Sequence, residues 1–497
     1  MTYLISAQEC DNLTIEEVWK LYADYVNPAQ VEILSKFSWG RDLISHAEGM
    51  YLHTRDGRRI LDFTGGIGVL DHGHNHPRIL AARRAYQDKK RMEIHKVIFS
   101  PYLAALSHNI AQLLPGDLNK SFFPNSGAEA VEGALKLAFK SHQARRDYVL
   151  FADIAFHGKL IGSGTISGLP QKHFEFPRME NTAAFKYGDL ESVAAQIAKL
   201  CKPDGESNVY AIIIEPFHAS TATPCSTEFL YGLRELCDRN GIVLIFDEVY
   251  MGWGKSGTLF YFMRHQGLVP DILVMSKSFG GGKSSISAYT ARDPVFWRAY
   301  GSVDAGLIHT STYNGFGEEC ATALEAIQIV IDEDYPGRAR RIHDKLVPML
   351  KALQQKYPKD IKELRGVGSF NSLILSSPFE MAENILKVFP VGPLKNKASY
   401  VNKVTAAAVA EALYRDHAIL SHILENRDTV MLGAGPSVIA EDEHLEYYID
   451  SLDKVLAKGL QWVVSHFAAK TLTRMALPSS LTRLRLLPKP MVGRRAC

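Results

Sequence analysis

Lys277 lies in a run of mostly small residues, Ser276–Gly282, that ends in three consecutive glycines and follows a short apolar segment. Burial among such residues lowers the pKa of a lysine and frees a nucleophilic amine, which can form an imine with an aldehyde. The commoner fate of a lysine is a solvated surface position. The run therefore predicts a candidate imine-forming lysine and needs support from other residues.

Asp247 ends the apolar run 241–247, thirty residues before the lysine. Proteins with α/β folds bind their ligands at the carboxyl ends of the strands. A carboxylate buried there needs a cationic partner. A protonated pyridine nitrogen is such a partner, and the ion pair keeps the ring able to accept electrons. A helix-capping or ion-paired aspartate is the alternative.

Ser126 and Gly127 directly precede a segment whose apolar residues Val131, Leu135 and Ala138 share one face of a helix. The backbone N–H groups at a helix N-terminus, with the positive end of the helix dipole, suit a phosphate. Simple capping of the helix by Ser126 is the alternative.

The elements that must position these residues are short, continuous apolar runs at 209–215, 241–247 and 271–275. Such runs are typical of strands buried on both faces in a parallel sheet, and the gaps between them are long enough for crossover helices. We predict an α/β fold with a large domain, residues 75–320, built on a mainly parallel sheet flanked by helices. The segments 1–74 and 321–469 should meet as a smaller α+β domain.

Composition excludes several classes of function. The 497 residues are 46% apolar and 22% charged, with a net charge of +2, so nucleic acid is not an expected partner. No signal peptide and no apolar run of membrane-spanning length is recognisable, which favours a cytoplasmic protein without membrane contact. The end of the chain, 470–497, is basic without an acid. We expect a disordered tail there, with docking on an acidic surface or a membrane as the alternative.

No metal site is predicted. Six cysteines are spread along the chain without a C-x-x-C pair, which argues against zinc and dithiol chemistry and fits a reducing compartment. The histidines from His72 to His76 look like a metal-binding tract, but a turn ahead of Pro77 is favoured. The Gly254–Ser256 and Gly282–Ser284 strings lack the glycine spacing of a P-loop.

The order of these features resembles the class III (ω-amino acid type) aminotransferases of pyridoxal phosphate (PLP) fold type I, over about residues 14–468. The resemblance is carried by the segments Leu61–Val69, Gly73–Pro77, Phe123–Ala130, Ala155–Gly158, Ile214–Pro216, Asp247–Val249, Ser276–Gly282 and His309–Tyr313.

The resemblance implies a role for each matching residue around the ring of PLP. Lys277 matches the lysine that carries the cofactor as an imine, a Schiff base. Asp247 matches the partner of the pyridine nitrogen, and Phe156 and Val249 match the residues on the two ring faces. Tyr250 stands where relatives often have a glutamine that binds the ring hydroxyl.

The resemblance also implies how the phosphate is bound. Ser126, Gly127 and Ala128 match the phosphate loop. Thr312 matches a threonine that reaches the phosphate from the second subunit, so a homodimer with shared active sites is implied.

Transamination is the implied reaction. An amine or amino acid donor would pass its amino group through pyridoxamine phosphate, in a ping-pong scheme, to an aldehyde, ketone or keto acid acceptor. A PLP-dependent racemase, decarboxylase or aminomutase of the same family is the alternative, because all these reactions share a carbanion. A non-catalytic protein on the same scaffold is a third hypothesis, disfavoured because Lys277 and Asp247 are both present.

The substrate end departs from the family pattern. Met431 aligns with the arginine that many relatives use to bind a substrate carboxylate, and Ser220 replaces their glutamate. Ala434-Gly435 and Phe316-Gly317 also replace family residues, and Arg427 is near enough to substitute for the missing arginine. We expect a carboxylate clamp that is missing or rebuilt, and an acceptor outside the usual α-keto acid pair, such as an aldehyde or ketone.

Overall fold

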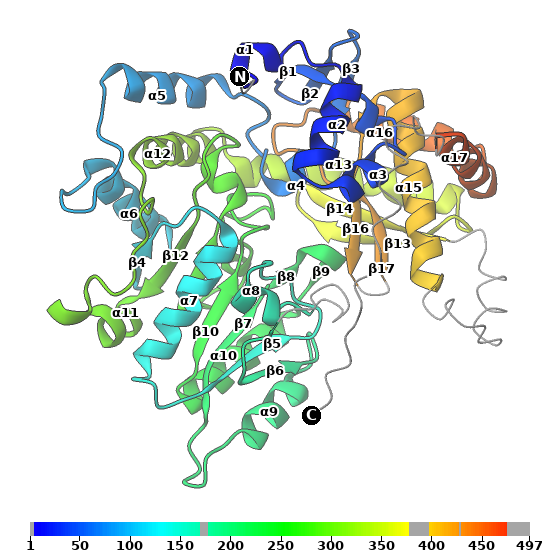
Figure 1. Cartoon of the computed structure of the whole chain (residues 1–497). Coiled ribbons are helices and arrows are strands. Elements are labelled where there is room, and N and C mark those ends of the chain that lie inside the picture. Colours follow the sequence, from blue (N-terminus) through cyan, green and yellow to red (C-terminus); the bar gives the residue numbers. More distant parts are fainter. Residues whose placement is uncertain (1–3, 169–176, 377–396, 427–428, 475–497) are drawn as a thin grey trace, which may run out of the picture.

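The computed structural model describes residues 4–168, 177–376, 397–426 and 429–474. Its larger part is built on a seven-stranded sheet with strand order β4-β12-β11-β10-β7-β5-β6 (Figure 1). Every strand except β12 runs in the same direction. The predicted mainly parallel sheet is therefore confirmed. The strands are β4 (Leu118–Phe122), β5 (Tyr148–Ala152), β6 (Thr182–Phe185), β7 (Val209–Ile214), β10 (Val243–Asp247), β11 (Ile272–Met275) and β12 (Ala288–Arg292).

The central strands are apolar because both of their faces are covered. All residues of β7, β10 and β11 are buried. Successive residues enter different apolar clusters: Leu244 packs on one side of the sheet and Ile245 on the other. Since side chains alternate across a strand, a sheet with helices on both faces needs an unbroken apolar run.

Helices cover both faces of this sheet (Figure 1). One apolar cluster joins the sheet to α6, α9, α10 and α12, and another joins it to α7 and α11. The helices of this part are α5 (Pro77–Asp88), α6 (Pro101–Leu113), α7 (Gly127–Ser141), α8 (Ile161–Thr165), α9 (Leu190–Lys199), α10 (Thr227–Asn240), α11 (Asp293–Tyr300) and α12 (Gly317–Asp332).

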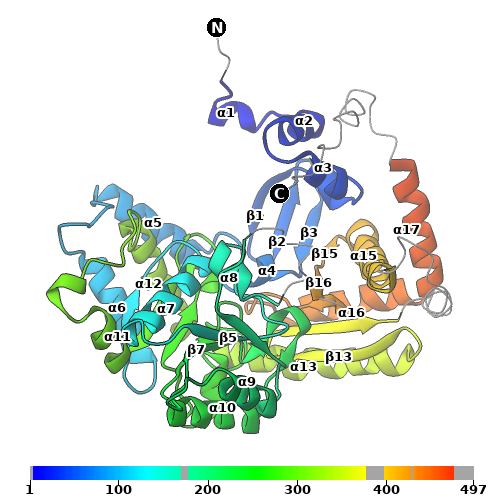
Figure 2. The same ribbon diagram turned by 60° about the horizontal axis from the view of Figure 1, so that its bottom comes forward.

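Two smaller sheets lie beside the large one (Figure 2). The first joins β1 (Ile44–Glu48), β2 (Tyr51–Thr54), β3 (Arg59–Asp62) and β15 (Ile419–Leu420), and the second joins β13 (Ile361–Val367), β14 (Phe370–Leu375), β17 (Thr429–Ala434) and β16 (Ile423–Asn426). Their helices are α4 (Gly65–Gly68), α13 (Tyr335–Lys356), α15 (Lys397–His417), α16 (Asp442–Leu456) and α17 (Leu460–Arg474).

Short elements complete the chain. The N-terminal helices are α1 (Ala7–Cys10), α2 (Ile15–Tyr25) and α3 (Pro28–Leu34). The remaining two-stranded pair and the 3-10 turns are β8 (Phe217–His218), β9 (Thr223–Pro224), η1 (Trp39–Arg41), η3 (Ala219–Thr221), η4 (Tyr261–Arg264), η5 (Lys277–Gly280) and η6 (Val303–Ala305).

The two ends of the chain share one apolar cluster. Phe63 packs there with Leu346, Leu413 and Leu452, and Ile419 of β15 pairs in parallel with Leu61 of β3. The domain limits at 74, 320 and 469 stay predictions, and the one at 320 falls inside α12. Of the predicted tail, residues 470–474 end α17, and 475–497 lie outside the described residues.

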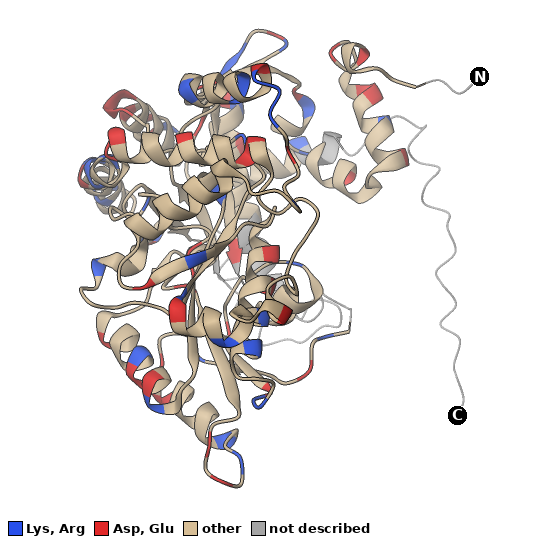
Figure 3. Ribbon diagram, turned by 90° about the vertical axis from the view of Figure 1, so that its left-hand side faces the viewer, with Lys and Arg blue, Asp and Glu red and all other residues tan. Residues whose placement is uncertain are grey.

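Along the ribbon in Figure 3, basic and acidic residues are interspersed among the helices and loops. Among the helices in the described ranges, none is long and apolar enough to cross a bilayer.

Candidate active site

A cavity of about 750 Å³ opens at the carboxyl ends of β7, β10 and β11, where β16 of the second small sheet closes one side. Strands β10 and β11 are parallel, with Asp247 opposite Val274, so the residues that follow them emerge at the same edge. The cavity brings together Gly127, Ala128, Phe156, Asp247, Val249, Tyr250 and Lys277. Seven of the nine predicted site residues therefore line one space.

Lys277 begins the turn η5 directly after β11 and Ser276. Its φ of 52° is left-handed, a conformation that costs energy for a residue with a side chain and is concentrated at functional sites. Burial, with the positive charge of Lys255, lowers the pKa of Lys277 to about 8. Its Nζ lies 4.6 Å from the centre of the Tyr250 ring. About a tenth of this amine is therefore uncharged and nucleophilic at pH 7, far more than for an ordinary lysine.

A buried ion pair fixes the chain beside Lys277. The Lys255 ammonium and the Ser278 hydroxyl both donate to the Asp71 carboxylate, and the Ser278 hydroxyl also lies 2.9 Å from the Gly68 carbonyl. All three side chains are buried. Lys255 was recognised in the sequence only as part of a failed P-loop string, because Asp71 is distant in the chain.

Asp247 is buried at the end of β10 and has two donors. Its Oδ2 accepts a hydrogen bond from His157 Nδ1 at 2.7 Å, and its Oδ1 accepts one from the Val249 N–H at 3.0 Å. Within the described part of the chain, His157 Nε2 is buried without a partner. Sequence reasoning gave His157 no role, although it belongs to the Ala155–Gly158 segment.

Glu215 is a second buried acid in the cavity that sequence reasoning left without a role. It accepts hydrogen bonds from the N–H groups of Phe156, at 2.9 Å, and Ala219, at 3.3 Å. Burial and the neighbouring Asp247 raise the pKa of Glu215 to about 8. The sequence signal that could have identified Glu215 is its position directly after the apolar strand β7. Asp247 occupies a similar position at the end of β10.

The N-terminus of α7 forms one wall of the cavity. Ser126 caps the helix by accepting a hydrogen bond from the Glu129 N–H at 3.3 Å. The N–H groups of Gly127 and Ala128 belong to the first turn, where a helix offers no internal acceptor. A Cβ on Gly127 would lie 3.2 Å from both Val249 methyl groups, so glycine permits this close approach. Capping by Ser126 thus leaves two N–H groups for an anion.

Lys277, Asp247 and the first turn of α7 suit three parts of PLP that a protein must hold: the aldehyde, the ring nitrogen and the phosphate, respectively. A volume of about 750 Å³ is in the range of small-molecule sites. The side chains of Phe156 and Val249 line the same cavity, where an aromatic ring would have to lie. The residues present therefore fit this cofactor.

The substrate end contains Ile67, Ser220 and residues 423–425 of β16, and the Lys159 side chain also lines it. Met431 does not line the cavity. It is fully buried in an apolar cluster with Phe217 and Phe370, and its sulfur accepts a hydrogen bond from Ser372.

The remaining predicted residues lie elsewhere. Thr312 is exposed on the loop after η6 and does not line the cavity of its own chain. Arg427 lies outside the described residues.

The histidines from His72 to His76 have separate partners. His72 bonds to the Ala326 carbonyl, His74 to the Asp62 carboxylate, and His76 lies 3.6 Å from Glu333. A cluster of three or more potential metal ligands does not occur within residues that the structure describes.

The fold is similar to the solved structures of several aminotransferases. The ornithine aminotransferase of Toxoplasma gondii ME49 is 24% identical, with a TM-score of 0.75, over 92% of this chain and 100% of that one. A transaminase from the marine bacterium Virgibacillus is 20% identical, with a TM-score of 0.74, over 85% and 94%. A pyridoxamine phosphate (PMP)-bound aminotransferase from Vibrio fluvialis is 22% identical, with a TM-score of 0.71, over 84% and 92%.

The family model for class III aminotransferases matches residues 40–410, which is most of the chain. This match covers β1–β3 and the entire cavity edge of the large sheet. The chain belongs to the class III aminotransferases, enzymes that use PLP to transfer an amino group from a donor to a carbonyl acceptor.

Proposed function

We propose that Lys277 is the residue that binds PLP covalently and then moves the proton during transamination. The single observation that supports this most is the low-pKa amine of Lys277 in the same cavity as the buried Asp247. PLP supplies an electron sink and the carrier of the amino group when it is bound. Once released by a donor amine, the Lys277 side chain can act as base and then as acid.

Asp247 is proposed to hold the ring nitrogen protonated. The hydrogen bonds from His157 and from the Val249 N–H fix both oxygens of the Asp247 carboxylate. The carboxylate is therefore already oriented before the ring binds, and its surroundings need not rearrange. Glu215 fixes the backbone of Phe156, which is proposed to lie on one ring face, with Val249 on the other. Tyr250 covers the Lys277 amine from the side of the smaller sheets.

The phosphate of PLP is proposed to bind at the N–H groups of Gly127 and Ala128, with Ser126 at the start of the same helix. The donor is an amine and the acceptor a carbonyl compound. Since Met431 is buried among apolar side chains, a bidentate carboxylate clamp at that position is not formed. We therefore favour an aldehyde or ketone acceptor.

A homodimer with shared active sites is proposed, in which Thr312 serves the partner's phosphate site. The segment 92–99 lies against the loop that carries Thr312, because Lys96 bonds to Asn314 at 3.0 Å. Apolar side chains in the segment 92–99, in η6 and on the loop after it are highly exposed: Val97, Phe99, Val303 and Leu307. Large exposed apolar side chains are typical of a protein interface.

The cytoplasm is the proposed compartment. Five cysteines of the described residues are free thiols, and two of them, Cys10 and Cys201, are exposed. Free exposed thiols are typical of a reducing environment.

The test exchanges Lys277 for alanine. Lys277→Ala should lose both the absorbance of covalently bound PLP and measurable turnover, whereas Lys283→Ala, an exposed lysine six residues on, should keep both. Turnover retained by Lys277→Ala would refute the proposed role. Formation of the aminated cofactor on addition of a donor alone separates transfer from racemisation and decarboxylation.

A further inference from the structure

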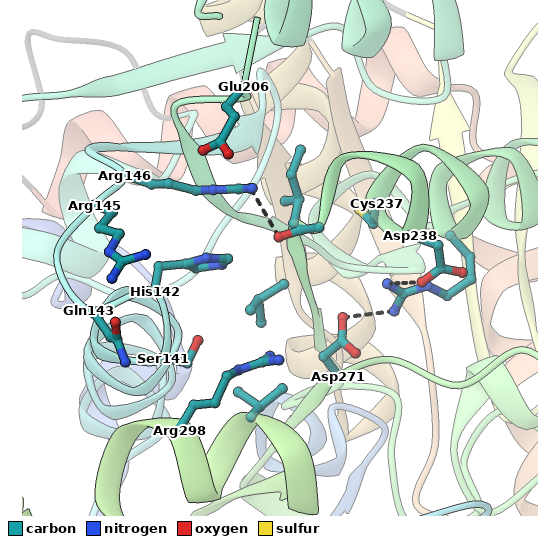
Figure 4. Close-up of a pocket in the computed structure, with 15 residues that line it drawn as sticks. Ser141, His142, Gln143, Arg145, Arg146, Glu206, Cys237, Asp238, Asp271 and Arg298 are labelled. Atoms are coloured by element: carbon teal, nitrogen blue, oxygen red, sulfur yellow. Dashed lines mark hydrogen bonds and ion pairs between the residues drawn. The ribbon is translucent and has the colours of Figure 1, made fainter. Parts of the chain in front are cut away.

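A second cavity, of about 450 Å³, lies at the opposite edge of the large sheet (Figure 4). Val243 and Asp271, at the starts of β10 and β11, line it, whereas Asp247 and Lys277 follow the other ends of these strands. At about 3.3 Å per residue, β10 separates the two cavities by roughly 13 Å. The second cavity is therefore not part of the active site.

Arginine side chains from two parts of the chain meet at this cavity. Arg145 and Arg146 precede β5, and Arg298 belongs to α11. Burial lowers the pKa of the neighbouring His142, which caps the C-terminus of α7, to about 4, so this ring adds no charge near neutral pH. In Figure 4 these side chains surround the same open space. Arg145 and Arg298 form no ion pair with a carboxylate of the described residues.

The acids that line the cavity do not neutralise these cations. Asp271 and Asp238 are held by Arg234, at 2.9 and 2.8 Å, and Asp271 also lies 3.4 Å from Arg292. Glu206 is the acid on the side of Arg145 and Arg146 (Figure 4). The side of the cavity away from Arg234 thus carries a net positive charge.

Arg146 is held in place without losing its charge. Its Nη1 donates to the carbonyls of Val209, Asn240 and Gly241 at 2.9–3.0 Å. Carbonyl groups orient a guanidinium but leave its unit charge unneutralised, and its other nitrogens stay available to an anion. A preoriented arginine binds an anion at a smaller entropic cost than a mobile one.

From these contacts we infer that the second cavity is a binding site for a small phosphate-bearing polyanion. Arg145, Arg146 and Arg298 supply guanidinium groups, which match phosphate oxygens in geometry and charge. A volume of about 450 Å³ accommodates a diphosphate group or a small metabolite that carries one. A free diphosphate and a nucleotide share this chemistry.

The test is calorimetric titration of inorganic pyrophosphate, and separately of ATP, into PLP-saturated enzyme, in which the phosphate site of the catalytic cavity is occupied. Saturable binding of either probe is expected, and the tighter probe identifies the form of the ligand. Arg298→Gln should weaken binding roughly tenfold while transaminase turnover is unchanged. Arg239→Gln removes the same charge from an exposed position on α10 outside the cavity and should bind as the wild type does.

Two results would overturn the inference. One is the absence of saturable binding of both probes at millimolar concentration. The other is an equal loss of affinity in Arg298→Gln and Arg239→Gln, which would show attraction to surface charge rather than to this cavity.

Discussion

The hydrogen bond between His157 and Asp247 offers a direct test of how the active site works. His157→Leu removes the donor that lies 2.7 Å from Asp247 Oδ2. Asp247 stays buried and keeps only the Val249 N–H as a partner. The carboxylate then loses one of the two donors that orient it, and it holds a protonated ring nitrogen less well.

The magnitude follows from the energy of that bond. A hydrogen bond to a charged group contributes about 1.5–3 kcal/mol. Since about 1.4 kcal/mol corresponds to a factor of ten, the rate of the half-reaction with an amine donor should fall roughly 10- to 150-fold. His157→Asn places an amide N–H near the position of Nδ1, so it should recover much of this loss.

The assay is a single-turnover half-reaction, followed by the change in cofactor absorbance when an amine donor is added. PLP content should be retained in His157→Leu, because Lys277 and the α7 N-terminus are untouched. His76→Asn is the control, since His76 faces Glu333 and lies outside the cavity. An unchanged half-reaction rate in His157→Leu, or equal losses in the leucine and asparagine variants, would refute the reasoning.

Three further predictions concern the amine, the substrate end and the dimer. The rate at which cofactor-free protein takes up PLP should rise with pH, because the uncharged Lys277 amine reacts, and the midpoint of this rise should lie at about pH 8. A midpoint near 10.5 in stopped-flow absorbance would contradict the lowered pKa. Met431→Arg should lower the free energy of unfolding by roughly 3 kcal/mol or more, because it buries an unpaired charge. Met431→Leu should lower it by less than about 1.5 kcal/mol, as measured by denaturant unfolding. Equal stability of the two variants would mean that the arginine reaches a partner. Phe99→Glu should shift the protein from dimer to monomer in size-exclusion chromatography and lower turnover with it, while Trp462→Glu, exposed on α17, should not; a dimeric Phe99→Glu variant would argue against the proposed interface.

Much of the large sheet was predictable from local patterns. The apolar runs around β7, β10 and β11 identified strands buried on both faces, because the side-chain period of a strand allows no polar position when both faces are covered. The carboxyl ends of parallel strands share an edge, so the proximity of Asp247 and Lys277 followed as well. The helix N-terminus after Ser126 was also local information, because a capping residue and an apolar face lie within a few turns.

Contacts between distant segments were not predictable in the same way. His157 reaches Asp247 across 90 residues of sequence, and Lys255 pairs with Asp71 across 184. Each of these residues has an ordinary local sequence, since a histidine or a lysine in a loop has many fates. Their roles depend on where two loops meet after the sheets have packed.

By itself, the sequence determined the family and the parallel sheet, and it predicted the order of the candidate cofactor-binding residues, because each rests on periodicity or on a motif within one segment. Tertiary structure alone decided that Met431 is buried in an apolar cluster rather than exposed to substrate, and that β16 closes the cavity. The second cavity also exists only in the folded chain, because its lining residues come from α7, α10, α11 and the loops before β5 and β7. The physical reason is that a binding site is defined by distances between side chains from separate elements, and packing fixes those distances only in the folded chain.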